Sequence, residues 1–72
     1  MLLTDIATRA SALIAAAEAD GVVIDDGNVI DLLADNITRA SLDDLRCALV
    51  VAGYAQRFPR ATSRNLREGG GR

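Results

Sequence analysis

The chain has 72 residues, enough for one small domain, and a fold of this size leaves much apolar surface unburied unless a partner subunit covers it. The single cysteine, Cys47, excludes an internal disulfide, and the absence of histidine leaves no obvious zinc site. Charge is divided along the chain: residues 1–56 carry nine acids and three arginines, whereas residues 57–72 carry five arginines and one glutamate. This division predicts an acidic body with a basic arm that meets a partner.

The first predicted helix covers residues 4–19, where apolar residues recur at steps of three and four. Thr4 is expected to cap its start, and Asp5 suits the positive end of the helix dipole. Gly21 is the expected left-handed stop, which places the end of the helix at Ala19.

The apolar stretch of residues 13–19 ends in small residues, as a secretory signal does, but it is interrupted and Asp5 precedes it. The longest strongly apolar run, residues 47–52, is far shorter than the roughly 20 residues of a membrane-spanning helix. We therefore expect a cytoplasmic protein without a membrane segment. Every basic residue is arginine and alanine is the commonest residue, which indicates GC-rich coding, as in actinobacteria or their phages.

Residues 22–24 form a short apolar connector, or a short strand that only a dimer partner could complete. The second predicted helix covers residues 26–36, and Asp25 and Asp26 stand where a helix start favours carboxylates, so capping is preferred to metal binding. The stretch Ala19–Asp25 resembles the carboxylate-bearing loops of EF-hand and tellurite-resistance proteins, but no frame supplies the EF-hand ligands, so we assign no metal ligand.

The third predicted helix covers residues 42–58, between a capping box of Ser41 with Asp44 and the break at Pro59. The three helices predict an all-α, three-helix bundle over residues 1–58, followed by an Arg-rich tail over residues 59–72 that is either loose or a short helical turn.

The third helix carries too much apolar surface for one core, since its apolar arc spans about 240° on a helical wheel. Two rows share that arc. The first row is Leu42, Leu45, Leu49 and Ala52, and the second is Cys47, Val51, Tyr54 and Phe58. Either the helix is central and packs against both others, or the second row, which holds both aromatic residues, is a partner interface.

Arginines recur at steps of three and four around the start of the tail, which places four of them on one side of a helix if the segment coils. They are Arg57, Arg60, Arg64 and Arg67. Such a row suits phosphates or an acidic partner. It could also pair with Asp31 and Asp35 of the second helix, in the same chain or in a neighbouring subunit.

The chain has neither histidine nor lysine, and Cys47 lies within a helix without a base to activate it, so we expect no enzyme and no cofactor. The leading prediction is a protein-interaction module, a homodimer or a phage or actinobacterial accessory protein that binds a host protein. The alternative is a small DNA-binding regulator or antitoxin-like protein that uses the tail. The third helix itself does not suit a DNA groove, because Asp43 and Asp44 stand at its start.

Overall fold

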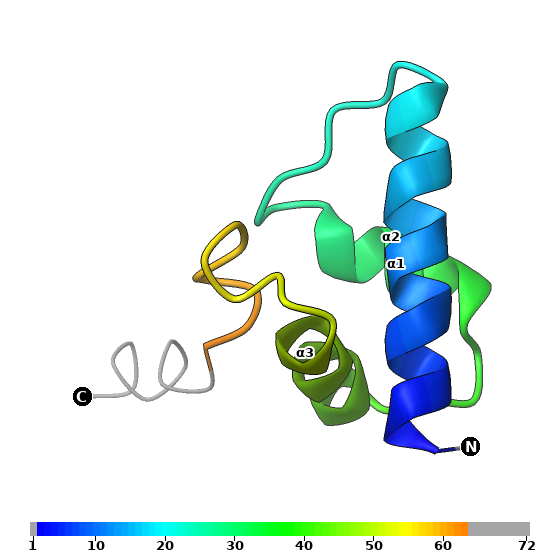
Figure 1. The fold of residues 1–72 in the computed structure, drawn as a ribbon, viewed down its shortest axis with the longest axis vertical. Helices are drawn as coiled ribbons and strands as arrows, with labels where there is room; N and C mark the ends of the chain where they lie inside the picture. The colour runs from blue at the N-terminus through cyan, green and yellow to red at the C-terminus, as the bar shows by residue number, and fades with distance from the viewer. Residues whose placement is uncertain (1, 64–72) are drawn as a thin grey trace.

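A computed structural model describes residues 2–63, and these residues form three α-helices and no strand (Figure 1). The helices are α1 (Leu3–Ala19), α2 (Val29–Asn36) and α3 (Leu42–Val51). In Figure 1, α1 stands upright, α2 passes behind it, and α3 lies beside its lower half, viewed nearly end-on. The predicted all-α, three-helix fold is confirmed.

The helix α1 begins one residue earlier than predicted. Leu2 is its extended N-cap, and the Leu2 carbonyl accepts the amides of Asp5 and Ile6. Thr4 therefore lies inside the first turn, where its carbonyl accepts the Thr8 hydroxyl, so the prediction that Thr4 caps the helix is wrong. The predicted stop is confirmed, since Gly21 has a φ of 88°.

The connector between α1 and α2, residues 22–25, has no regular secondary structure. It is followed by one turn at residues 26–28 that the prediction had included in the helix. Asp25 Oδ1 accepts the amide of Asn28 at 3.1 Å, and Asn28 Oδ1 accepts the amide of Asp25 at 2.9 Å. This reciprocal pair caps the turn, as expected for Asp25, but Asn28 has a φ of −124°, so regular helix starts only at Val29.

The start of α3 is as predicted, because the Ser41 hydroxyl accepts the amide of Asp44 at 3.1 Å and the Asp44 carboxylate accepts the amide of Ser41 at 3.1 Å. Its end is not, since α3 stops at Val51 rather than at Phe58. Gly53 has a φ of 91° and ends the helix, as Gly21 ends α1.

Beyond α3, the chain continues as the C-terminal turns, a name used here for residues 54–63. The amide of Phe58 donates to the carbonyl of Tyr54, and the amide of Thr62 donates to that of Phe58. These turns fold back on the helices, because the Asp26 carboxylate accepts the amides of Arg60 and Ala61 at 3.1 and 3.0 Å. Residues 59–63 thus lie against the body, and the division into a domain and a tail at residue 59 stays a prediction.

The core is apolar throughout and receives side chains from all three helices and from the C-terminal turns. Its largest fully buried side chains are Phe58, Ile14, Leu33, Ile37, Leu45, Leu49 and Val29. The helices α1 and α3 pack most closely together. The outer side of α3, which faces away from α1, therefore belongs to the surface.

Candidate interaction surface

The second apolar row of the third helix is divided by the end of α3. Val51 is 52% exposed and Cys47 is half-buried, but Phe58 is only 1% exposed and belongs to the core. Tyr54 is half-buried, and its hydroxyl lies 3.5 Å from that of Ser11. The predicted row of Cys47, Val51, Tyr54 and Phe58 is therefore not one helical surface, because the chain leaves the helix at Gly53.

The first apolar row is mostly internal. Leu45 and Leu49 are buried against the rest of the core, and Ala52 packs at its margin. Leu42 differs, since it is 51% exposed at the start of α3. The helix does pack through this row, so only its opposite side is available to a partner.

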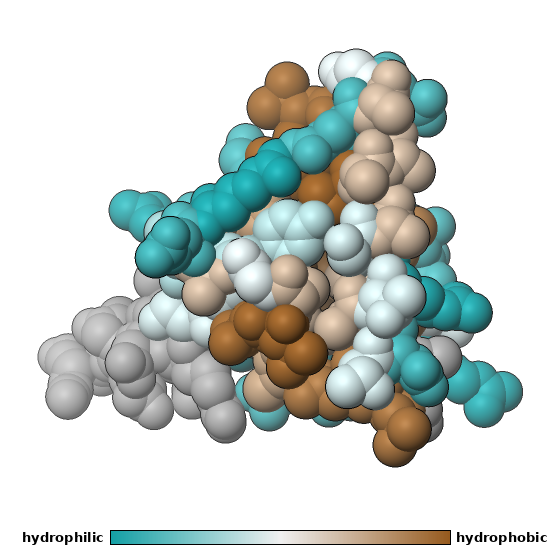
Figure 2. Space-filling view, viewed as in Figure 1, coloured by the Kyte–Doolittle hydropathy of each residue, from teal (hydrophilic) through white to brown (hydrophobic). Residues whose placement is uncertain are grey.

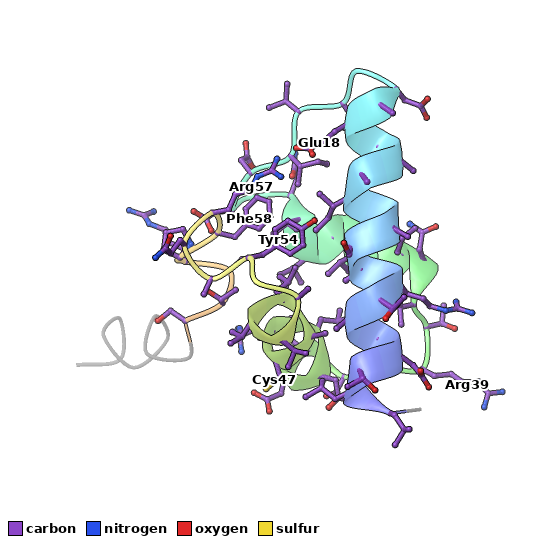
Figure 3. All side chains as sticks on the ribbon, viewed as in Figure 1. Glu18, Arg39, Cys47, Tyr54, Arg57 and Phe58 are labelled. Atoms are coloured by element: carbon purple, nitrogen blue, oxygen red, sulfur yellow. The ribbon has the colours of Figure 1, made fainter. Side chains whose placement is uncertain are left out.

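The outer side of α3 carries a group of exposed apolar side chains that we call the α3 patch. Its members are Leu3, Val50 and Val51, which are exposed, and the half-buried Cys47. A groove of about 320 Å³ runs along it, lined by Leu3, Arg46, Cys47, Val50, Val51 and Thr62. Figure 3 shows Cys47 at the lower edge of α3. The helical wheel already left Val50 exposed among polar residues, whereas the apolar spacing of the first helix had counted Leu3 with its buried face.

A second hollow, of about 580 Å³, lies between α1 and the end of α3. Small side chains line it: Thr4, Ala7, Thr8, Ser11, Ala12, Ala15, Val51 and Ala52. Val51 lines both hollows and forms a ridge between them. Figure 2 shows apolar surface where the end of α3 approaches the start of α1, on the lower part of the molecule.

The predicted arginine row is not formed by its two described members. Arg57 makes an ion pair with Glu18 of α1, and its guanidinium lies 5.0 Å from the centre of the Phe58 ring (Figure 3). Arg60 instead lines a groove with residues of α2 and α3. Arg64 and Arg67 lie outside the described residues, so their part of the prediction has no structural counterpart.

The basic segment does turn back on its own body, but through other acids than predicted. Arg57 reaches Glu18, whereas Asp31 and Asp35 of α2 are exposed and form no ion pair within residues 2–63. Glu18 was missed because two acids on one face of a helix, such as Asp31 and Asp35, are easier to recognise in the sequence than a single acid near a helix end.

Metal-ligating side chains are scattered over the part of the chain that the structure describes. No three carboxylate, cysteine or histidine side chains of residues 2–63 are placed to share a metal ion. Cys47 lies beside apolar side chains and Arg46 in its groove. No helix within these residues is long and apolar enough to cross a membrane.

Comparisons with protein families, curated proteins and solved structures found no match to this chain. The function of this chain is therefore inferred from its own surface.

Proposed function

We propose that the protein is a non-enzymatic interaction module that forms a homodimer through the α3 patch and the adjoining hollow of α1. The observation that carries the proposal is the gathering of exposed apolar side chains on the outer side of α3. Of the seven large exposed apolar side chains among residues 2–63, four lie there or at the adjoining N-terminus: Leu2, Leu3, Val50 and Val51. Contiguous apolar surface of this kind marks interaction sites on soluble proteins.

The shape of this surface suits a second copy of the same chain. A twofold interface brings the same patch from both subunits together, so it must contain both a projection and a recess that accepts it. The Val51 ridge and the small-residue hollow beside it provide these two parts on one face. Small side chains such as Ala12 and Ala15 also allow the partner helix to approach closely.

The required area is compatible with this one face. A stable interface buries about 800 Å² on each partner. The accessible surface of the chain is 4724 Å², so a dimer of ordinary size would cover roughly one sixth of it. A partner of this kind would also supply the apolar burial that a domain of 72 residues lacks by itself.

The test is the mass of the particle in solution, measured by light scattering coupled to size-exclusion chromatography. We expect a dimer for the natural chain and a monomer for Val51→Asp, because a carboxylate would be buried at the centre of the interface. Val23→Asp is the matched control, since Val23 is 76% exposed on the connector, away from both hollows. A natural chain that is monomeric at high concentration, or a Val51→Asp variant that stays dimeric, would contradict the proposal.

The DNA-binding alternative stays a prediction that concerns Arg57, Arg60, Arg64 and Arg67. It is tested on the same samples by titration with duplex DNA at several salt concentrations. A monomer whose DNA affinity falls steeply with salt, and is lost when the chain is cut after Ser63, would favour the regulator over the homodimer. The partner from a host cell also stays a prediction.

A further inference from the structure

A third groove, of about 370 Å³, lies where the start of α2, the start of α3 and the C-terminal turns meet. We call it the arginine groove. It is lined by Asp26, Gly27, Ile30, Leu42, Arg46, Arg60 and Ala61. It differs from the hollow beside Val51 in position and in chemistry, because it combines two guanidinium groups with apolar side chains.

The two arginines of this groove have no acidic partner in the described part of the chain. The only ion pair formed within residues 2–63 joins Arg57 to Glu18, so Arg46 and Arg60 are left without one. Arg60 is exposed and Arg46 is half-buried. Neither guanidinium is thus paired within residues 2–63, and Arg favours planar, two-pronged contacts with carboxylates.

The one acid that lines the groove is already occupied. Asp26 Oδ1 accepts the backbone amides of Arg60 and Ala61, which holds its carboxylate against the C-terminal turns. The arginine groove is thus locally cationic on a protein whose first 56 residues carry a net charge of −6. A binding partner must match the local charge rather than that of the whole body.

Apolar side chains make up another part of the lining of the arginine groove. Leu42 is half exposed, Ile30 is partly buried, and both line the groove beside the arginines. A ligand with negative charge alone, such as a nucleic-acid backbone, would leave this apolar surface uncovered. A peptide that alternates apolar and acidic side chains would cover the apolar surface and pair with the arginines together.

We propose that the arginine groove binds an acidic, amphipathic segment of a partner protein, with apolar side chains on Ile30 and Leu42 and carboxylates on Arg46 and Arg60. This site is separate from the proposed homodimer interface, and binding there does not depend on dimerisation. Arg46 also lines the groove of the α3 patch, so Arg60 is the residue that distinguishes the two sites.

The test is a titration of the full chain with a fluorescein-labelled synthetic peptide whose leucines and glutamates recur at helical spacing, followed by anisotropy. We expect saturable binding, and weaker binding of the same peptide with glutamine in place of each glutamate. Arg46→Gln and Arg60→Gln should each weaken the acidic peptide about three- to fivefold, as for exposed charge pairs. Arg39→Gln, in the exposed loop between α2 and α3, is the charge-matched control and should bind as the natural chain does.

The outcomes separate this proposal from the homodimer. Arg60→Gln should lose peptide affinity while its mass by light scattering stays that of the natural chain. Equal binding of the acidic and glutamine peptides, an equal loss in Arg39→Gln, or no saturable binding would each overturn the proposal. Stronger binding of duplex DNA than of the peptide, lost in Arg60→Gln, would overturn it in favour of nucleic acid.

Discussion

Gly53 determines where α3 ends and therefore which side chains reach the surface. Its left-handed backbone, with a φ of 91°, lets the amide of Tyr54 bond to the carbonyl of Leu49 at 2.9 Å and its own amide bond to the carbonyl of Val50 at 3.0 Å. This pair of bonds is the Schellman arrangement, which closes a helix. The chain then turns toward the body, and Phe58 enters the core instead of continuing along α3.

Replacement of Gly53 by alanine should destabilise the fold through the backbone alone. A Cβ at this position meets no atom within 4 Å, so no clash is expected. The left-handed conformation itself costs a residue with a side chain about 1 kcal/mol. We expect Gly53→Ala to lower the free energy of unfolding by that amount in urea denaturation followed by circular dichroism.

Two further variants control this experiment. Gly21→Ala should cost about the same, since Gly21 has a φ of 88° and equally open surroundings. Gly53→Asn should cost less, because asparagine tolerates the left-handed region better than alanine does. If Gly53→Ala is as stable as the natural chain, the turn at Gly53 is not required and α3 can continue as a longer helix.

At the scale of the elements, α3 has two sides with different roles, and the C-terminal turns complete one of them. Leu45 and Leu49 face the core, and Phe58 fills the space beside them from the turns. Val51 lies on the opposite side and contributes to the surface. Stability and partner binding should therefore respond to different residues, although the sequence had grouped Val51 with Phe58.

Phe58→Ala and Val51→Ala test this separation of roles. Removing the ring of a fully buried phenylalanine costs about 3–5 kcal/mol, so we expect Phe58→Ala to be largely unfolded in circular dichroism. Val51→Ala should change the stability of the isolated chain by less than about 0.5 kcal/mol, as exposed substitutions do, yet weaken dimerisation in sedimentation. A Phe58→Ala variant that folds but stays monomeric would instead show that Phe58 acts at the partner interface, as the sequence analysis had grouped it.

The start of α3 was easier to predict than its end, for a physical reason. The Ser41 and Asp44 pair is a local signal, because both hydrogen bonds of the cap join residues three apart. A glycine within an apolar periodic stretch is ambiguous, since it is tolerated in a helix at a cost of about 1 kcal/mol and also favoured just after one. Pro59 is a stronger stop signal than Gly53, so the third helix was predicted to continue past Gly53 to Phe58.

The candidate sites depend on contacts between residues far apart in the chain, which periodicity does not reveal. Asp26 holds the amides of Arg60 and Ala61 across more than thirty positions of sequence, and this contact builds one wall of the arginine groove. The sequence predicted Asp26 as a helix-capping residue and Arg60 as part of an exposed row. The helical wheel indicated excess apolar surface on the third helix, but only the fold shows that Arg46 and Arg60 lie beside one groove.

For the molecule as a whole, the proposed homodimer would couple folding to association. A short chain buries a smaller share of its surface than a larger domain does, so its stability is marginal. Three of the exposed apolar side chains, Leu42, Val50 and Val51, are on α3, which packs most closely against α1. A partner that covers this side would bury apolar surface and stabilise the α1–α3 pair together.

If the proposed homodimer forms, the thermal midpoint should depend on protein concentration. A folded chain associates with a second folded chain and not with an unfolded one. Each tenfold increase in protein concentration above the dissociation constant should therefore add about 0.7 kcal/mol of stability per chain. For a domain of this size, such a gain raises the midpoint by a few degrees. We expect this rise for the natural chain and for Val23→Asp in scanning calorimetry, and a constant midpoint for Val51→Asp. A constant midpoint for the natural chain over a hundredfold range would show that folding does not depend on a second copy, and the α3 patch would then need a different partner.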